Sequence, residues 1–503
     1  MPTLLSYALV PVLLSLFLVT RWIPEVDFAS PQCSALSLLL SNKVAFPTNA
    51  VYTSSLDSYF SVQGGSLQPA CIVNPTTAAE VSTIVKSLAF LQRFSFRQCQ
   101  FAIRSGGHTH WAGAANIHEG VVIDLKHLND VVPDADGKIT AVGPAATWGK
   151  VYMLLDQVNL SVVGGRNFDV GVGGLLTGGG ISFFSPQFGL ACDNVQNYEV
   201  VLADGSIVNA NANENPDLFL GLKGGSNNLG IVTRFDLKTF PQGKMWGGNI
   251  FRPVETLSQT LDAFTEFAGA KDYDEHAALI HTFGYGAAHG YAVASSLEYA
   301  KEEAMPAVFK ELASIEPQWH NTMRLTNLSD LTLELSTLSP LGQRHSWAAT
   351  TFKNDRDMMN KAIEAFNGTI APIMDVPGLQ TSLVFQPIPV AITEKSGHAG
   401  GNSLGLDATA GPLVLALIVT TYASATDDSR VTEANRLALD GIDTAAKEAG
   451  LYHPFIYLNY AASHQDPIAG YGTASRAHLQ RTSRKYDPSG VFQKCVPGGY
   501  KLF

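Results

Sequence analysis

The chain has 503 residues, of which 46% are hydrophobic and 15% charged, and its formal net charge is −11. This composition excludes global disorder, and the length favours two domains or one large composite domain. Because no cluster of lysine and arginine interrupts the negative background, a nucleic acid is excluded as an expected partner.

The N-terminus begins with an apolar run from Leu4 to Thr20, broken only by Pro11 and two serines. The run is short for a membrane span, which needs about 20 residues, and it fits the core of a secretory signal peptide. No lysine or arginine precedes it and Arg21 follows it, which leaves a retained signal anchor open. We expect a signal peptide over about residues 1–29, a secreted protein and no membrane span after its removal.

Cysteines and glycosylation motifs agree with secretion. The odd number of cysteines leaves at least one thiol unpaired, and the five are Cys33, Cys71, Cys99, Cys192 and Cys495. We predict a disulfide between Cys33 and Cys71, which both lie in the N-terminal region outside the glycine-rich stretches. Sequons occur at Asn159, Asn327 and Asn367.

The first folded elements predict a β-α-β unit. Residues 69–73 and Phe101–Arg104 are typical of buried strands, and Thr76–Leu91 between them has helical spacing and a threonine to cap it. The unit closes at Arg104-Ser105-Gly106-Gly107-His108-Thr109.

That closing turn has the residues of a phosphate cradle. Adjacent glycines let the backbone turn sharply and approach a ligand, and successive N–H groups in such a turn can bind a phosphate oxygen. His108 stands beside them with a ring nitrogen that can act as a nucleophile or a ligand. The pattern favours a phosphate-bearing cofactor bonded to the protein, with an ordinary turn between strands as the alternative.

Strands at Val121–Leu125 and Ile139–Val142 and a helix at Thr147–Val158 precede a dense glycine run, Gly171–Gly180. We predict a loop for this run, because glycine destabilises helix and strand interiors. A Rossmann fingerprint is disfavoured, since no buried strand leads into the run and no helix with a following acidic residue comes after it.

The remainder predicts an α+β arrangement. A hairpin at residues 197–208 and a strand at Gly230–Leu237 come before Pro241 and Gly243, where we place a domain boundary. Helices are predicted at Val254–Ala268, Lys301–Ile315, Asp357–Phe366, Arg430–Ala449 and Tyr471–Tyr486. Strands are predicted between them at Ala277–Phe283, Tyr291–Leu297, Ala348–Phe352 and Leu413–Thr420.

These motifs, in this order, resemble the vanillyl-alcohol-oxidase/p-cresol-methylhydroxylase superfamily of flavoproteins, and within it the secreted fungal, berberine-bridge-enzyme-like oxidases. The resemblance runs from about Gln68 to the C-terminus. The motifs that carry it are Arg104–His108, Val122–Leu125, Val170–Gly180, Asp193–Val195, Val200–Gly205, Gly230–Thr233, Tyr457–Tyr460 and Lys485–Pro488.

The resemblance implies a two-part FAD-binding domain of the PCMH type over 66–242 and a substrate domain over 243–450, an antiparallel sheet covered by helices. Residues 451–503 would return to the FAD domain. His108 would be bonded to the flavin. The other implied cofactor residues are Arg104, Ser105, Gly106, Gly107, Thr109, Val170, Gly171, Gly174, Gly178, Gly179, Asn194, Gly230, Ile231, Val232 and Asn459.

Many relatives have a second flavin link, from a cysteine just before the glycine run, and here Asn167 occupies that slot. We therefore predict FAD bound through one histidine, and interpret Cys192 as a buried thiol. Val170, three residues beyond the slot, influences oxygen access in the family, and its modest side chain is more typical of oxidases than of dehydrogenases.

The implied function is oxidation of a small molecule, with a tyrosine as the base that removes the substrate proton. Tyr460 and Tyr457 are the candidates, and Asn402 is expected to contact the substrate. We expect a monomer that oxidises an alcohol or amine, a secondary metabolite, and reduces oxygen to hydrogen peroxide. Oxidative cyclisation, carbohydrate oxidation and a secreted flavin-fold binding protein remain alternatives.

Two further motifs do not indicate a function. His108-Thr109-His110 lacks the partner ligands that zinc requires, so we expect no metal. Gly401-Asn402-Ser403-Leu404-Gly405 matches a hydrolase elbow but lacks the apolar strand before it and the helix after it.

Overall fold

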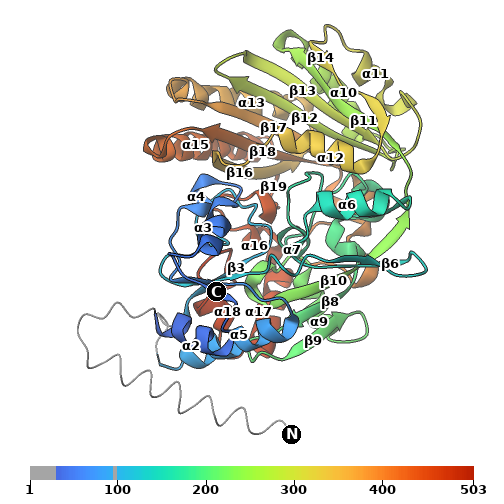
Figure 1. Ribbon diagram of the computed structural model, residues 1–503. Helices are drawn as coiled ribbons and strands as arrows, with labels where there is room; N and C mark the ends of the chain where they lie inside the picture. Colours follow the sequence, from blue (N-terminus) through green and yellow to red (C-terminus); the bar gives the residue numbers. More distant parts are fainter. Residues whose placement is uncertain (1–29, 95–98) are drawn as a thin grey trace.

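The computed structural model describes residues 30–94 and 99–503 (Figure 1). The predicted signal peptide, residues 1–29, lies outside this range. Within the described residues, none of the helices combines the length and the apolar character needed to cross a membrane.

Three parallel strands and one antiparallel edge strand form a four-stranded sheet. β2 (Cys71–Val73) and β3 (Phe101–Arg104) both pair with β4 (Val121–Asp124), and β1 (Val44–Ala45) pairs antiparallel with β2. The helix α5 (Ala78–Leu91) connects β2 to β3. The predicted β-α-β unit is confirmed, with β4 inserted between its two strands.

α5 forms where its sequence pattern predicts it. The Thr77 hydroxyl accepts a hydrogen bond from the Glu80 backbone N–H and caps the first turn. The side chains of Val81, Ile84 and Leu88 repeat at helical spacing and are fully buried against the sheet.

A second, six-stranded sheet has the order β5-β6-β10-β8-β9, with β7 paired to β10. Its long central strand β10 pairs antiparallel with β6, β7 and β8. The strands are β5 (Val131–Pro133), β6 (Ile139–Val142), β7 (Leu160–Val162), β8 (Val195–Val201), β9 (Ile207–Asn211) and β10 (Ile231–Pro241).

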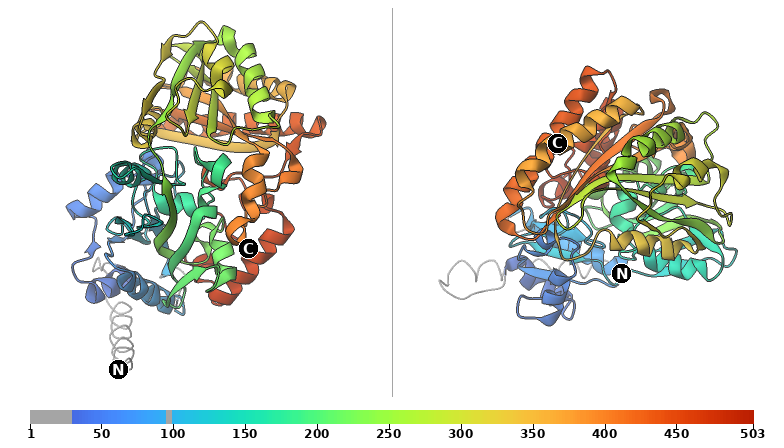
Figure 2. Two further views of the ribbon diagram at one scale, coloured as in Figure 1. Left: turned by 90° about the vertical axis from the view of Figure 1, so that its right-hand side faces the viewer. Right: turned by 90° about the horizontal axis from the view of Figure 1, so that it is seen from above.

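The third sheet is antiparallel and has nine strands, in the order β14-β11-β13-β12-β17-β18-β16-β19, with β15 paired to β11. Apolar residues on one of its faces pack against α10, α13 and α15 in a core of their own. Figures 1 and 2 show this layer above the two smaller sheets. The long strands are β11 (Met245–Pro253), β12 (Ala277–Gly286), β13 (Gly290–Tyr299), β16 (Arg344–Lys353), β17 (Gln380–Ile388) and β18 (Leu413–Tyr422). The short strands are β14 (His320–Asn321), β15 (Arg324–Thr326) and β19 (Tyr452–His453).

Most predicted helices of this region are confirmed, but Lys301–Ile315 is not a single helix. Only α11 (Lys310–Ser314) forms, after a 3-10 turn. Pro306 has no N–H to donate, and Met305 before it adopts a positive φ of 52°, so a helix cannot run through them. The longer helices are α6 (Trp148–Asp156), α10 (Leu257–Gly269), α12 (Leu328–Thr337), α13 (Arg356–Ile370), α15 (Asp428–Glu448) and α17 (Gly472–Tyr486).

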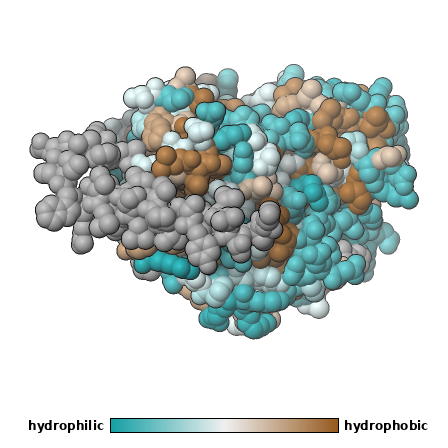
Figure 3. Space-filling model, turned by 60° about the horizontal axis from the view of Figure 1, so that its bottom comes forward, coloured by the Kyte–Doolittle hydropathy of each residue, from teal (hydrophilic) through white to brown (hydrophobic). Residues whose placement is uncertain are grey.

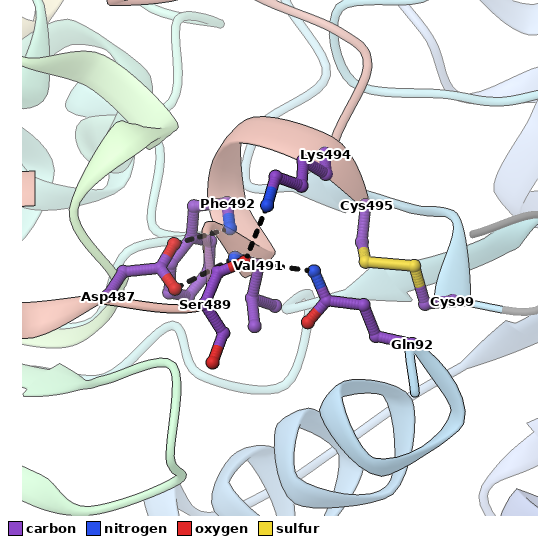
Figure 4. Close-up of a disulfide and its surroundings, with 8 residues drawn as sticks. All are labelled: Gln92, Cys99, Asp487, Ser489, Val491, Phe492, Lys494 and Cys495. Atoms are coloured by element: carbon purple, nitrogen blue, oxygen red, sulfur yellow. Dashed lines mark hydrogen bonds between the residues drawn. A yellow bond between two sulfur atoms is a disulfide. The ribbon is translucent and has the colours of Figure 1, made fainter. Parts of the chain in front are cut away.

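Shorter helices complete the fold, and two disulfides hold it. Cys33 is bonded to Cys71, which confirms that prediction, and a second disulfide joins Cys99 to Cys495 (Figure 4). Cys192 is a buried free thiol. The remaining helices are α2 (Pro31–Leu39), α3 (Ala50–Asp57), α4 (Val62–Gly65), α7 (Val172–Thr177), α8 (Ser185–Phe188), α9 (Pro216–Leu222), α14 (Val390–Thr393), α16 (Pro467–Gly470) and α18 (Val491–Lys494).

Candidate active site

A cavity of about 560 Å³ lies between the glycine loops and the nine-stranded sheet. Its walls come from the turn after β3, the glycine run, the start of β10, the C-terminal tail and β11, β12, β13, β16, β17 and β18. Predicted site residues that line it are Ser105, Gly106, Gly107, His108, Thr109, Val170, Gly171, Gly174, Gly230, Ile231, Val232, Tyr457, Asn459 and Tyr460.

Two glycine loops meet backbone to backbone in the wall. A Cβ on Gly106 would lie 2.7 Å from the Gly171 Cα, and a Cβ on Gly171 would lie 2.6 Å from the Gly106 nitrogen. Gly107 has a φ of 68°, in the left-handed region that favours glycine. The Ser105 hydroxyl donates to the Pro144 carbonyl, which ties the turn to the chain between β6 and α6.

The glycine run does not form the predicted loop throughout. Val172–Thr177 is a short helix, α7, whose Gly174 faces the cavity. A Cβ on Gly174 would meet nothing within 4 Å. The glycine is therefore not required by the protein's own packing, and the cavity has room for a bound group against it.

These residues fit a flavin cofactor. The Nε2 atom of His108 is buried without a hydrogen-bond partner, and the ring lies in the wall beside the glycine turn. Burial lowers the pKa of His108 to about 4, so its imidazole is neutral near pH 7 and retains a nitrogen lone pair. A neutral imidazole beside a backbone cradle is suited to a covalent histidyl link.

His108 is held by a stack of rings. Phe60 lies between His108 and His345, with ring centroids 3.9 Å and 4.0 Å away and interplanar angles of 17° and 22°. Phe60 also donates its backbone N–H to the Gly107 carbonyl. The stack fixes the plane of the His108 ring, and it joins the glycine turn to β16 of the large sheet.

Tyr457 lines the cavity, but its hydroxyl is held by hydrogen bonds within the protein, and its catalytic role stays a prediction. Its hydroxyl accepts hydrogen bonds from the backbone N–H groups of Gly180 and Ile181, at 3.1 and 3.0 Å. The Asn459 amide donates to the same oxygen. Burial raises the pKa of Tyr457, which disfavours the phenolate that a base requires.

Tyr460 has a different environment. The Arg166 Nη2 donates to its hydroxyl oxygen at 2.9 Å, and the Gln386 Oε1 lies 3.5 Å from the same atom. Arg166 also donates to Gln386 Oε1. Because arginine can only donate, the Tyr460 oxygen is the acceptor in that contact, and its proton remains available for Gln386 or a substrate.

Four predicted cofactor residues lie behind the wall and do not line the cavity. Arg104 donates to the backbone carbonyls of Ser55 and Ser58 beneath the glycine turn. The Asn194 amide donates to the carbonyls of Phe188 and Leu190. The four residues are Arg104, Gly178, Gly179 and Asn194.

The two glycines among them are needed for packing. A Cβ on Gly178 would lie 2.1 Å from the Asn459 Oδ1, and Gly179 has a φ of 113°. Their role is to let the Tyr457–Tyr460 segment approach the glycine run.

Asn402 does not line this cavity, and its predicted contact with the substrate stays untested. Its amide donates to the Asp193 Oδ1 at 2.8 Å, and the Asp193 carboxylate accepts the Leu190 N–H. This loop closes over the turn before β8, so its hydrogen bonds are used within the protein.

Sequence reasoning missed Arg166, Gln386, Phe60 and Trp347. Arg166 comes directly before Asn167, the residue in the slot of the second flavin link. No local sequence pattern indicated that the Arg166 side chain would face the cavity. Gln386 and Trp347 lie on strands of the large sheet, and they face the cavity because of the pleat.

The predicted glycosylation sites differ in exposure. Asn159 and Asn327 are exposed, whereas Asn367 is half-buried within α13. Attachment at all three stays a prediction, and exposure favours the first two.

The fold and the cavity define a class of protein: a flavin-dependent oxidoreductase in which a two-part nucleotide domain carries a sheet-roofed substrate domain. A family model described as an FAD binding domain matches residues 69–211. The chain belongs to a family of FAD-linked oxidoreductases that includes fungal FAD-dependent monooxygenases.

Its similarity to fungal relatives covers nearly the whole chain. An FAD-dependent monooxygenase, CTB5, of Cercospora beticola is 38% identical over 93% of this chain and 91% of its own length. A second, FUP4 of Fusarium proliferatum (strain ET1), is 38% identical over 95% of each.

Solved structures agree in fold. Glucooligosaccharide oxidase of Acremonium strictum has a TM-score of 0.74 at 19% identity, over 95% of this chain and all of that one. For 6-hydroxy-D-nicotine oxidase of Arthrobacter nicotinovorans the TM-score is 0.72 at 21% identity, over 92% and 97%. At these identities the likeness concerns the fold alone.

Proposed function

We propose that the protein is an FAD-dependent oxidase that takes a hydride from an alcohol or amine carbon of a small molecule, a secondary metabolite. The electrons then pass to oxygen, which becomes hydrogen peroxide. One observation carries the proposal: a single cavity contains both the His108 glycine cradle and the Tyr460 hydroxyl.

Bound FAD would supply the two-electron acceptor for this reaction. Ser105–Thr109, Gly171, Gly174 and Gly230–Val232 would hold it through backbone groups that line the cavity. As a phenolate, Tyr460 would take the substrate's O–H or N–H proton, because the residue lines the cavity and Arg166 donates a hydrogen bond to its oxygen.

We further propose that His108 is the single covalent attachment point of FAD. The neutral, unpartnered imidazole supports the link, and Asn167 offers no thiol for a second one. The test is flavin fluorescence of the acid-denatured protein band on a denaturing gel. We expect fluorescence in the wild type and none in His108→Ala; fluorescence that persists in the variant would move the anchor elsewhere.

The oxidase reaction can be tested without knowing the substrate. The purified holoenzyme is reduced anaerobically with dithionite and then mixed with aerated buffer. We expect rapid reoxidation and one hydrogen peroxide per flavin, measured with a peroxidase-coupled dye. Slow reoxidation would contradict the oxidase assignment and favour a dehydrogenase.

A second candidate is a monooxygenase, and the names of the two fungal relatives at 38% identity favour it. A monooxygenase inserts one oxygen atom into its product. Reaction under ¹⁸O₂ separates the two: label in the product favours the monooxygenase, and label recovered only as hydrogen peroxide favours the oxidase.

Oxidative cyclisation, carbohydrate oxidation and a non-catalytic binding role remain alternatives to simple alcohol oxidation. Secretion is supported by two disulfides, since such bonds persist in oxidising compartments. A monomer stays our expectation. On the face in Figure 3, hydrophobic residues form several groups among hydrophilic ones.

A further inference from the structure

The charge of the cavity is unusual. Among the described residues that line it, Arg166 is the only arginine, lysine, aspartate or glutamate. No carboxylate in the described part of the chain forms an ion pair with it. A half-buried guanidinium thus stands in a largely uncharged wall, where an anionic ligand would complete the site.

Arg166 is only partly used by the protein. Both of its hydrogen bonds to described residues come from one nitrogen, Nη2, which donates to Tyr460 and to Gln386. Its Nε and Nη1 donate to no described residue. The fork geometry of a guanidinium binds a carboxylate or another anionic oxygen through two parallel N–H groups.

Glu298, a carboxyl whose charge could compensate that of Arg166, is uncharged near neutral pH. Glu298 on β13 interacts electrostatically with Arg166, but burial raises the pKa of Glu298 to about 8. Its carboxyl therefore retains its proton, and accepts a hydrogen bond from the Ser296 hydroxyl at 2.5 Å. The positive charge on Arg166 remains uncompensated.

One face of the large sheet forms a broad apolar surface in the same cavity. Its side chains come from five adjacent strands and, because alternate residues share a face, they lie in one layer. The apolar ones are Phe251, Ile280, Ala294, Val384, Leu417 and Val419, and the hydroxyl residues Thr282 and Ser382 lie among them. The register places Ala294 opposite Phe251, and Leu417 opposite Val384.

We infer that Arg166 and Gln386 bind an anionic oxygen of a flat, largely apolar substrate: a carboxylate or an ionised acidic hydroxyl. The inference rests on the proposed function and names its substrate class. A neutral sugar fits less well, because the apolar layer offers few partners for its many hydroxyl groups, and the Arg166 charge would remain unpaired.

The test uses isothermal titration of the holoenzyme with matched probes. One pair is 2-naphthoate and the neutral 2-naphthamide; the other is 2,4,6-trichlorophenolate and the neutral 2,4,6-trichloroanisole. We expect the wild type to bind one anion at least about tenfold more tightly than its neutral counterpart. The pair that shows the preference distinguishes a carboxylate from a phenolate.

Arg166→Gln should abolish the preference, because binding of the anion should weaken much more than binding of its neutral counterpart. The control is Arg436→Gln, which removes an exposed guanidinium paired with Glu433 and Asp440, and it should behave as wild type. No anion preference in the wild type, or a preference that survives in Arg166→Gln, would overturn the inference.

Flavin absorbance of each protein separates this inference from the proposed function. A wild type that never carries flavin would remove the proposed function itself. A wild type that carries flavin but shows no anion preference would refute only the substrate inference. If Arg166→Gln then also changed the reduction potential of the flavin, the Arg166 charge would act on the cofactor.

Discussion

Glycines in the cavity wall have two distinct physical roles. Gly106 and Gly171 let two backbones touch, and a side chain on either would clash with the protein itself. Gly174 has open space beyond its missing Cβ although it lies within the helix α7. Of these three glycines, only Gly174 therefore indicates that the cavity has room for a bound group.

Gly174→Leu should therefore separate cofactor binding from folding. Leucine favours helix over glycine and meets no protein atom at its Cβ, so the apoprotein should unfold at an unchanged or higher temperature. The added side chain fills the cavity, and we expect flavin affinity to fall at least about tenfold. The measurement is the ratio of flavin to protein absorbance, and normal flavin content would show that the space is unused.

Glu298 should make stability depend on pH. Burial raises the pKa of this carboxyl from 4.5 to about 8, against the opposing effect of Arg166 and with a small contribution from Glu334. The folded protein thus holds a proton that the unfolded chain releases, and the stabilisation is complete below pH 4.5 and lost as pH rises to about 8. The slope is at most about 1.4 kcal/mol per pH unit.

The comparison is with Glu298→Gln, a neutral isostere. The unfolding temperature of Glu298→Gln minus that of the wild type should increase as the pH rises from 5 to 8. Parallel profiles over this range would show that folding does not raise the pKa of Glu298, because its carboxyl would then be ionised in both the folded and the unfolded state.

At the scale of elements, the segment between α3 and α4 links the two halves of the site. Phe60 contacts His108, while the backbone N–H of Val62 donates to the Gln343 carbonyl next to β16. The Gln63 amide donates to the His345 carbonyl. A segment outside the predicted FAD domain thus positions His108, the proposed attachment residue.

Phe60→Leu should lower covalent flavin incorporation, because His108 loses the ring that fixes its plane. Total flavin, bound with or without the bond, should change less. The measure is the fraction of flavin that stays with acid-precipitated protein.

The matched control is Phe264→Leu, equally buried in the separate core behind the large sheet. Both changes should cost about 1–3 kcal/mol of stability. Equal losses of covalent flavin in the two variants would mean that general destabilisation, and not ring stacking, is responsible.

At the scale of the whole molecule, the C-terminal tail is anchored to the first sheet. Figure 4 shows α18 with its N-terminal N–H groups donating to the Asp487 carboxylate, at 2.8 Å for both Val491 and Phe492. The Cys99–Cys495 disulfide then joins α18 to the chain entering β3. The tail contributes Gly499 and Tyr500 to the cavity wall, so this anchor also supports the site.

Replacing Cys99 and Cys495 by serine should destabilise the protein more than replacing Cys33 and Cys71. The two bonds close loops with sequence separations of 396 and 38 residues, which do not overlap. Loop-closure entropy gives a difference of about 2 kcal/mol between them. Urea unfolding midpoints of the two double variants measure it, and a reversed order would contradict the entropic account.

Local sequence determined much of this protein. The β-α-β unit and the glycine turn with His108 follow from periodicity, capping and backbone sterics, which act over a few residues, whereas the Tyr457–Tyr460 segment was singled out by the family resemblance. The motif order was enough to identify the family. The same local rules failed at Lys301–Ile315, where a proline overrides helical spacing.

Tertiary structure decided which side chains meet. Arg166 reaches Gln386 and Tyr460 across 220 and 294 residues, and Cys99 reaches Cys495 across 396. The Asn402 side chain binds Asp193, and the Arg104 side chain binds the segment before β2. Their positions in the motifs had predicted contacts with the substrate and the cofactor. Such contacts depend on how sheets and loops pack, and no short-range pattern in the chain records that packing.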